Sequence, residues 1–244
     1  MSIIQRFFTL RVVAFASCLA TTVSPAQAAL TIDSTRIVHG TDSRNSSVIV
    51  ANPSNSTFAA QAWVNTEEDD TVTPVPLIAS PALFRLDPGK QQMVQINRLP
   101  NDLPEDRESL FYFNVQEIPQ QLETNANLLN IALRTRIKLF YRPSGLAGSP
   151  AEAVSRLGWQ GQEGGGLRVS NPGPFHISLS EVLLSGQHLA WREGGVLPPY
   201  GSLSLPMAGA VPAGARGRLR WIDDDGNYHE QGFVLSKHGG ERDE

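Results

Sequence analysis

The chain contains almost no cysteine, since Cys18 is the only one among its 244 residues. Cys18 lies within an N-terminal segment that has the features of a removable leader, so the remaining chain cannot form an internal disulfide. Disulfides are common in exported proteins, and without one each domain must be stabilised by its own apolar core. The lack of a second thiol also excludes a dithiol redox motif.

Basic residues are not in excess either, because the formal net charge of the chain is −4. The N-terminal leader contains two arginines and no acidic residue, which leaves 18 basic against 24 acidic side chains and a charge of about −6. Proteins that bind nucleic acids usually present a basic surface. We therefore expect no nucleic acid among the partners.

Long apolar runs are absent apart from Val12–Val23. Two arginines precede this run and the small-residue motif Ala26–Ala28 follows it, which together predict a signal peptide over residues 1–28. The run is short and contains serine and threonine, and no later segment is apolar enough to span a membrane. We expect an exported protein that starts at Ala29 and is not embedded in a membrane.

Helical periodicity is also absent, and the chain after Ala29 is a series of short strands separated by turn residues such as those of Asp87–Gly89. Turns roughly every 8–12 residues are typical of an immunoglobulin-like β-sandwich. The expected strands are Thr31–Val38, Ser47–Ala51, Ala59–Asn65, Leu77–Ala79, Gln92–Ile96, Ser109–Gln116 and Leu128–Tyr141, followed by Gly166–Asn171, His176–Leu184, His188–Arg192, Gly201–Leu205, Gly217–Asp223 and Tyr228–Leu235.

A Pro/Gly/Ser-rich joint, Pro143–Pro150, divides this pattern into two parts of about 100 residues each, the size of a typical domain. We predict an all-β protein with two immunoglobulin-like β-sandwich domains, residues 29–143 and 144–240. A polar tail, residues 241–244, follows them. The second domain has more glycine and fewer large apolar side chains, which predicts looser packing.

The sequence contains no constellation typical of an enzyme or a metal site. Asp223–Asn227 resembles the opening of a calcium loop, but its twelfth position is Val234 instead of glutamate, so a hairpin turn is the better interpretation. No serine lies in a Gly-x-Ser-x-Gly elbow, and the acidic Glu67–Asp70 is typical of a solvated loop. We expect no catalysis, metal or cofactor. The histidines, which show no ligand spacing, are His39, His176, His188, His229 and His238.

The segment Leu128–Pro143 is the most informative part of the chain. Leu129, Ile131 and Leu133 alternate with other residues, as in a strand with one apolar face. Several cations follow, and a central strand rarely tolerates so many, so at least one edge should be open. An apolar row on an open edge is an aggregation hazard, which favours pairing with another chain. The alternative is that the row faces the core of its own domain.

Arg36 and Lys138 lie in the first and last predicted strands of the first domain. Each alone is an ordinary surface cation, but two that converge could anchor the carboxylate of a chain terminus through charge-assisted hydrogen bonds of roughly 1.5–3 kcal/mol each. Lys138 has the opposite parity to Leu133, so the two would share a face only if a bulge or bend lay between them.

Several segments resemble the signature segments of the periplasmic pilus (fimbrial) assembly chaperones. The longest are Asp106–Pro119 (DRESLFYFNVQEIP) and Asn130–Pro143 (NIALRTRIKLFYRP). The resemblance implies two immunoglobulin-like domains joined at an angle, with a cleft between them. The loop Pro119–Asn127 resembles the short-loop type of this family. Shorter segments that support the resemblance in the same order are Gln61–Val64, Ala79–Pro81 and Arg85–Gly89.

The resemblance also implies roles for individual residues. Arg36 and Lys138 match the pair that grips the C-terminal carboxylate of a pilus subunit. Leu129, Ile131 and Leu133 match the alternating apolar side chains that enter the open groove of that subunit.

A second set of residues, Glu108, Arg142 and Asp224, resembles an interdomain ionic trio that fixes the angle between the domains. The implied function is that of a periplasmic chaperone of the chaperone–usher pathway. It binds pilus subunits by donor-strand complementation, caps their groove and delivers them to the outer-membrane usher. The alternative is a two-domain structural fimbrial or adhesin protein, and self-association of the free form is left open.

Overall fold

The computed structural model of the chain describes residues 30–70, 72–118, 131–162, 165–189, 195–207, 209 and 211–236. The predicted leader (residues 1–28), the loop Pro119–Asn127, Leu129 and the tail (residues 241–244) lie outside these ranges.

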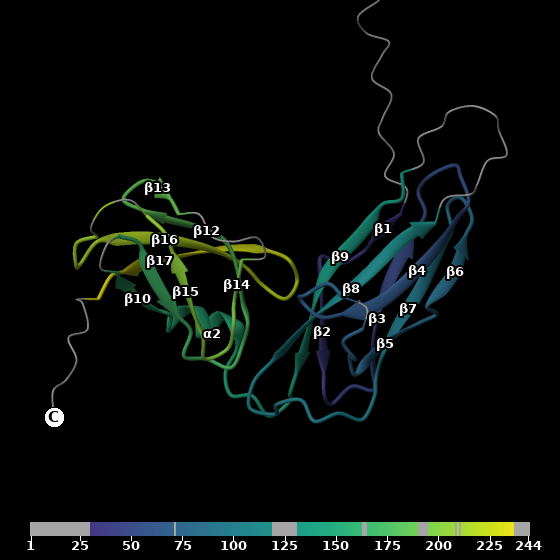
Figure 1. Cartoon of the computed structure of the whole chain (residues 1–244), viewed down its shortest axis with the longest axis horizontal. Helices are drawn as coiled ribbons and strands as arrows, with labels where there is room; N and C mark the ends of the chain where they lie inside the picture. The colour runs from purple at the N-terminus through teal and green to yellow at the C-terminus, as the bar shows by residue number, and fades with distance from the viewer. Residues whose placement is uncertain are drawn as a thin grey trace, which may run out of the picture.

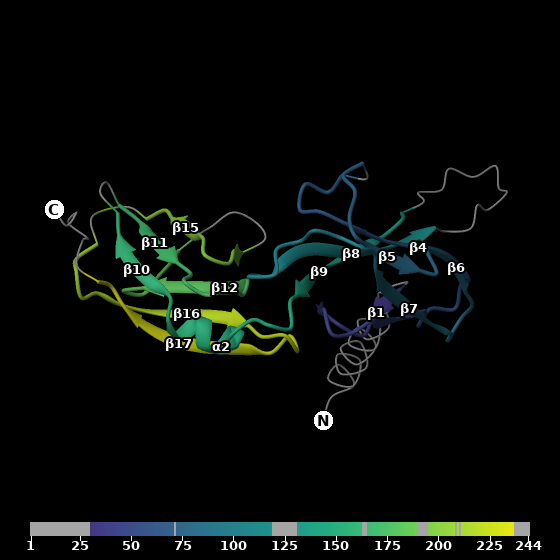
Figure 2. The ribbon, with the colours of Figure 1, turned by 90° about the horizontal axis from the view of Figure 1, so that it is seen from below.

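The described chain forms two β-sandwiches set at an angle to each other (Figure 1). The N-terminal part of the chain, purple to teal, builds one sandwich, and the C-terminal part, green to yellow, builds the other. The view from below shows that the two together form an elongated molecule (Figure 2). Neighbouring strands are antiparallel, with the exception of the parallel pair β2 (Arg36–Gly40) and β9 (Arg134–Arg142).

The first domain consists of two sheets that enclose its core. One sheet has the strand order β2-β9-β8-β4-β6, and the other has the order β1-β3-β7-β5. The remaining strands of the domain are β1 (Thr31–Ile32), β3 (Asn45–Ala51), β4 (Phe58–Asn65), β5 (Leu77–Ser80), β6 (Leu83–Leu86), β7 (Gln91–Arg98) and β8 (Ser109–Ile118).

The second domain also has two sheets. One has the order β10-β11-β15, and the other has the order β13-β12-β16-β17, with β14 paired to β12. Its strands are β10 (Gly158–Gly161), β11 (Leu167–Ser170), β12 (Ile177–Leu184), β13 (Gln187–His188), β14 (Val196–Leu197), β15 (Ser202–Leu205), β16 (Arg216–Ile222) and β17 (Tyr228–Val234).

Alternating burial explains why these segments form strands. In β7, Val94 and Ile96 are completely buried, whereas Met93 and Gln95, on either side of Val94, are exposed. Each domain has its own cluster of buried apolar side chains, and the two clusters share no residue. Phe113 lies completely buried in the first cluster and Leu219 is almost completely buried in the second. The prediction of an all-β protein with two sandwich domains is confirmed.

The prediction of one continuous strand over Thr31–Val38 was wrong, because this segment is divided between two sheets. β1 pairs with β3, whereas β2 pairs with β9 in the opposite sheet. Asp33 marks the crossing, since its N–H donates to the Ile49 carbonyl (3.1 Å) and its carboxylate accepts the Ile49 N–H (3.0 Å). A sequence pattern of period two does not show which sheet each residue joins.

The predicted strand Leu128–Tyr141 is also shorter in the structure, because β9 begins at Arg134. Of the residues before it, 131–133 are described and lie outside any strand. The Glu117 N–H donates to the Leu133 carbonyl (2.9 Å), which continues the contact with the end of β8 by one step.

The sequence did not predict the helix α2 (Pro150–Ser155), which begins at the last residue of the predicted joint. The Ser149 hydroxyl caps it by accepting the Glu152 N–H (3.2 Å), and Pro150 occupies its first turn. Ala153 and Val154 are buried in the second core. The strands β6, β10 and β14 were also missed, since each is too short to give a clear alternation. None of the described helices could cross a membrane.

Gly217 provides a test of the packing in the second domain. A Cβ at this position would lie 2.2 Å from Cζ of Phe233 and 2.7 Å from the carbonyl oxygen of Leu183. Phe233 has little room to retreat because it stacks on Trp159, with 3.7 Å between the ring centroids. We expect Gly217→Ala to lower the free energy of unfolding of this domain by about 1–3 kcal/mol, measured by urea unfolding.

Gly232, in the neighbouring strand β17, is the matched control. A Cβ there meets nothing within 4 Å, so Gly232→Ala should leave the unfolding midpoint unchanged. Equal losses in the two variants would contradict the packing argument.

Candidate functional site

The strand β9 has a neighbouring strand along nearly all of one edge but along only half of the other. β8 pairs with β9 from Arg134 to Tyr141, whereas β2 pairs with the other edge from Lys138 to Arg142. In the described chain, residues 131–137 have no strand beside this second edge. We call residues 131–137 the open-edge segment. Its unpaired N–H and C=O groups can form a ladder with another chain.

The predicted apolar row begins this segment. Ile131 and Leu133 are 64% and 50% exposed, so the alternative that they fill the core of their own domain is wrong. Leu129 lies outside the described residues. Further along β9, Ile137 and Leu139 have the same parity and are buried in the first core. The apolar row therefore continues the core face of the strand beyond the end of the core.

Lys138 lies on the opposite face of β9. The ladder between β8 and β9 runs from Gln116↔Arg134 to Ser109↔Tyr141 without a register shift. The bulge or bend considered from the sequence is therefore absent between Arg134 and Tyr141. Side chains of even number point away from the core of the first domain, and those of odd number point toward it.

Arg36 and Lys138 are directly opposite each other in the parallel register of β2 and β9. This pair of residues is the first rung of that ladder, so it lies where the open-edge segment ends. Arg36 is 8% exposed and its Nη1 donates to the carbonyl oxygen of Ile222 in the second domain (3.2 Å). Neither cation has a carboxylate within 4.0 Å among the residues that the structure describes.

Burial affects the electrostatics of both cations. Desolvation lowers the pKa of Lys138, and the positive charge of Arg36 lowers it further. Desolvation also lowers the pKa of Arg36, partly offset by the negative charge of Asp224. Desolvation and the mutual repulsion of the two cations both penalise their charged forms. An anion bound between the two side chains would offset this penalty. A carboxylate has the negative charge and the acceptor oxygens to do so.

The structure brings together Glu108, Arg142 and Asp224. Glu108 immediately precedes β8, Arg142 is the last residue of β9, and Asp224 lies in the turn between β16 and β17. The Nε of Arg142 donates to Glu108 Oε1 (2.5 Å), and its two terminal nitrogens donate to the carboxylate of Asp224 (2.7 and 2.8 Å). The side chain of Glu108 is 1% exposed and also accepts the N–H of His176 (2.7 Å). The three side chains therefore connect the domains through a partly buried ionic contact.

Figure 1 shows the β16–β17 hairpin, in yellow, reaching toward the first domain. Two backbone contacts between the domains were not predicted, one from the Ile222 carbonyl in this hairpin and one from the N–H of His176, just before β12. Every residue carries the same backbone groups, so the sequence gives no signal for them. The sequence predicts a row of cations after Leu133 and a solvated acidic loop over Glu67–Asp70, but it does not predict that Arg134 and Arg136 meet Asp69.

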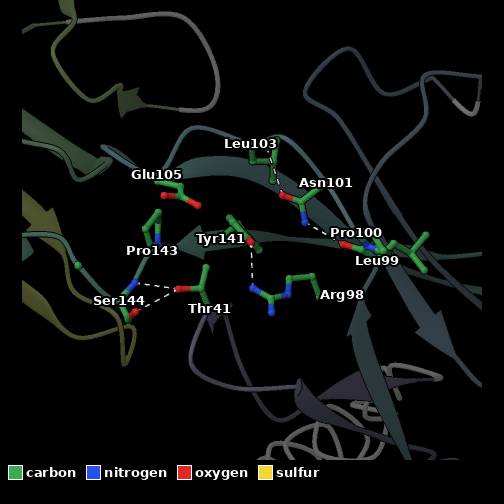
Figure 3. A pocket seen from close by; sticks show the side chains of 11 residues that line it. Thr41, Arg98, Leu99, Pro100, Asn101, Leu103, Glu105, Tyr141, Pro143 and Ser144 are labelled. Carbon is green, nitrogen blue, oxygen red and sulfur yellow. Dashed lines mark hydrogen bonds between the residues drawn. The ribbon is translucent and has the colours of Figure 1, made fainter.

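A cavity of about 660 Å³ lies beside the joint between the domains (Figure 3). Arg98 donates to the hydroxyl of Tyr141 (3.3 Å) and the Ser144 N–H donates to Thr41 Oγ1 (2.9 Å) across its wall. Its lining includes Glu105 but none of the predicted site residues. We assign no ligand to it.

The fold and the site define a class of protein: a pair of immunoglobulin-like domains with an open strand edge that starts with exposed apolar side chains and ends at a partly buried basic pair. Such a protein can lend a strand to a second chain. The family comparison is consistent with this class. Residues 29–147 match the family described as "Pili and flagellar-assembly chaperone, PapD N-terminal domain", and residues 152–233 match "Pili assembly chaperone PapD, C-terminal domain". The chain belongs to the pilus assembly chaperone family.

Curated relatives lie within the same family. The chain is 38% identical over 180 residues to "Chaperone protein PapD" of Escherichia coli, covering 70% of this chain and 72% of that protein. It is 35% identical over 221 residues to "Chaperone protein FimB/FhaD" of Bordetella pertussis, covering 86% and 89%. Among solved structures, it is similar to that of the Salmonella enterica SafA pilin in complex with the SafB chaperone, with a TM-score of 0.76, 28% identity and coverage of 87% and 99%.

The ionic contact between the domains can be tested with Arg142→Ala. This change leaves the buried carboxylate of Glu108 without its closest cation, and losing one partner of such a pair is strongly destabilising. We expect the free energy of unfolding to fall by about 2–4 kcal/mol, reduced from the fully buried case because Arg142 is partly exposed. Small-angle scattering should show a larger radius of gyration as the domains separate.

Arg85→Ala is the control, since Arg85 and its partner Asp87 are both well exposed. It should change neither stability nor shape. An Arg142→Ala variant with wild-type scattering would show that the ionic contact does not set the arrangement of the domains.

Proposed function

We propose that this protein is a periplasmic chaperone that captures pilus subunits by lending them the open-edge segment and delivers them to the outer-membrane usher. The observation that carries the proposal is the uncovered open-edge segment, which starts with exposed apolar side chains and ends at the pair of the buried Arg36 and the partly buried Lys138. The relative SafB, which is bound to the SafA pilin in its solved structure, supports it.

Anchoring of the subunit terminus is the first step. The carboxylate at the C-terminus of a subunit accepts hydrogen bonds from Arg36 and Lys138, each of which contributes roughly 1.5–3 kcal/mol. The anchor also sets the register, since a slip of one residue would turn every side chain of the paired strand to the wrong face.

Pairing of the backbones follows. The last strand of the subunit extends from the anchor along the open-edge segment, so that the unpaired N–H and C=O groups of both chains form a ladder. A strand in this position lies in the plane of the sheet. Its terminus can therefore reach Lys138 on one face while the body of the subunit covers Leu133 on the other.

Filling of the subunit groove completes the complex. Leu129, Ile131 and Leu133 enter the apolar groove that the missing strand of the subunit leaves, and each contributes roughly 1.5–3 kcal/mol if fully buried. The captured subunit is thereby kept from pairing with the wrong chain. A strand from the next subunit can release it at the usher by replacing the same contacts.

The anchor is tested by Arg36→Ala and Lys138→Ala. Loss of a charge-assisted hydrogen bond of roughly 1.5–3 kcal/mol weakens binding by at least about tenfold. We expect neither variant to co-purify with the pilin subunit that co-purifies with the wild-type chain, while circular dichroism shows an intact fold. The matched control is Lys90→Ala, which removes an exposed lysine in the turn before β7.

A double variant, Arg36→Ala with Lys138→Ala, that still binds the subunit would rule out the anchor. Mass determination of the purified wild-type complex distinguishes the alternative function, because a chaperone gives a one-to-one complex and a structural pilin gives self-polymers.

The apolar row is tested by Ile131→Asp. Because this side chain is 64% exposed, the variant should keep the unfolding temperature of the wild type yet lose subunit binding, since a charge cannot enter an apolar groove without a large desolvation penalty. Ile78→Asp, at a position that is 49% exposed in β5 of the other sheet, should retain both. Retained binding by Ile131→Asp would contradict the role of the row.

A further inference from the structure

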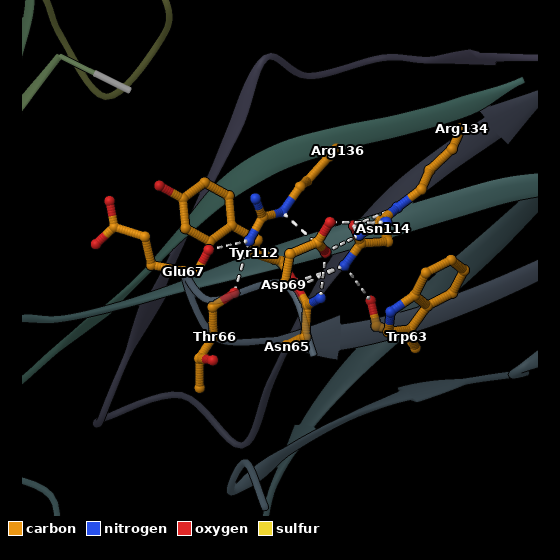
Figure 4. A network of polar contacts seen from close by, with 9 residues as sticks. All are labelled: Trp63, Asn65, Thr66, Glu67, Asp69, Tyr112, Asn114, Arg134 and Arg136. Carbon is orange, nitrogen blue, oxygen red and sulfur yellow. Dashed lines mark hydrogen bonds and ion pairs between the residues drawn. The ribbon is translucent and has the colours of Figure 1, made fainter. Parts of the chain in front are cut away.

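A connected network of polar and aromatic side chains lies on the outer face of the sheet, directly behind the open-edge segment (Figure 4). It joins β9 to the loop that follows β4. We call Asp69, Arg134 and Arg136 the outer-face clamp, because these three charged groups connect the two elements. The clamp rests on the neighbouring side chains Trp63, Asn65, Tyr112 and Asn114.

Arg134, the first residue of β9, is held from three directions. Its Nη1 donates to Asp69 Oδ2 (3.1 Å) and its Nη2 donates to Asp69 Oδ1, which gives a bidentate pair. Its Nε and Nη2 also donate to Asn114 Oδ1 on β8 (3.0 and 2.6 Å). The guanidinium lies over the ring of Trp63, with its Cζ 4.9 Å from the ring centroid.

Arg136, two residues further along, is held to the same loop. Its Nη2 donates to the carbonyl oxygens of Thr66 (2.6 Å) and Glu67 (3.2 Å). Its Nε lies 3.8 Å from Asp69 Oδ1. Its guanidinium also stacks on Tyr112, with 3.8 Å between Cζ and the ring centroid. Both arginines of the open-edge segment therefore converge on Asp69.

Asp69 is itself positioned by the fold. Its carboxylate accepts a hydrogen bond from the Nδ2 of Asn65 at the end of β4 (2.8 Å), and Asn65 in turn accepts from the buried Asn114 (2.9 Å). Its backbone has a φ of 61°, a conformation that aspartate and asparagine tolerate better than most residues. The hydrogen bond from Arg134 is the main reason that the pKa of Asp69 is lowered to about 2, so the carboxylate is ionised near neutral pH.

We propose that Asp69 is a positioning residue that, through Arg134 and Arg136, holds the open-edge segment extended and fixed in orientation before a subunit arrives. This inference rests on the proposed function and adds to it a residue that does not touch the subunit. It assigns a role in subunit capture to the loop after β4, which neither the anchor nor the apolar row requires.

The physical need for such a residue follows from the open edge. A strand with a neighbour on one side only has few hydrogen bonds to lose and opens easily. The clamp provides a second attachment that leaves the open edge accessible. Because side chains alternate between faces, fixing Arg134 and Arg136 on the outer face also directs Leu133 to the opposite face. A strand ordered in advance loses less conformational entropy on binding.

Asp69→Asn tests the inference with little change in shape. Asparagine tolerates the backbone conformation, but its amide replaces one carboxylate oxygen by an N–H donor facing the donors of Arg134. Exposed ion pairs are individually weak, so we expect the rates of hydrogen exchange and of association with the subunit to change by about threefold to fivefold. Hydrogen exchange of residues 131–137 in the free protein should be faster by this factor, and association with the co-purifying pilin subunit slower.

The matched control is Asp87→Asn, which removes the charge of a second exposed ion pair, with Arg85, far from β9 in the strand order. It should alter neither quantity. Arg134→Gln is a second variant that breaks the same contact from the other side and should reproduce the effect of Asp69→Asn. In all three variants, exchange in β3 and β7 should match the wild type, because their contacts are unchanged.

Three outcomes would overturn the inference: wild-type exchange and association in Asp69→Asn and Arg134→Gln, the same changes in Asp87→Asn, or faster exchange throughout the first domain. Ile131→Asp separates this result from the proposed function. If Ile131→Asp loses binding while the clamp variants bind normally, only the positioning role fails. If Ile131→Asp binds as the wild type does, the proposed function itself fails.

Discussion

The incomplete pairing of β2 with β9 is the constraint on which the rest of the structure depends. Arg36 is paired with Lys138, and continuing this parallel register backward would place Thr31 beside Leu133. The chain instead turns at Asp33, and Thr31 pairs with Ala51 in the other sheet. The crossing therefore removes from β9 the strand that would have covered it. An open edge with a defined end results, and the basic pair marks that end.

The second domain also contacts the first domain at the basic pair that we propose as the anchor. Arg36 donates to the carbonyl oxygen of Ile222, and Arg142 reaches Asp224 in the turn that follows. The same hairpin thus contacts both β2 and β9, in the part of β9 that follows the open-edge segment. A carbonyl can orient a guanidinium without neutralising it, whereas a carboxylate in the same place would compete with the terminus of a subunit. The placement of Asp224 on Arg142 leaves the positive charge of Arg36 available.

Much of this could be predicted from the sequence, and the remainder could not for identifiable reasons. The alternation of Leu129, Ile131 and Leu133 and the cations that follow them predicted an open strand edge, because period two is a local property. The division of Thr31–Val38 between sheets escaped prediction, since a period-two pattern does not show which sheet a residue joins. The contact between Asp69 and Arg134 joins residues 65 positions apart. Neither has a local signal beyond its charge, so only the folded chain shows that they meet.

The two faces of β9 differ in a way that makes an exposed apolar edge tolerable. Unprotected strand edges promote aggregation, and charged side chains are a common means of preventing it. Here the outer face carries Arg134 and Arg136, both in contact with Asp69, while the opposite face carries Ile131 and Leu133. A partner chain that turned its apolar face toward the outer face of β9 would place it against the two guanidinium groups. This would remove water from both groups at a cost in free energy. On the proposed function, the edge therefore favours a partner whose groove lies on the apolar side. The charges that hold the strand in place also determine which face a partner can cover.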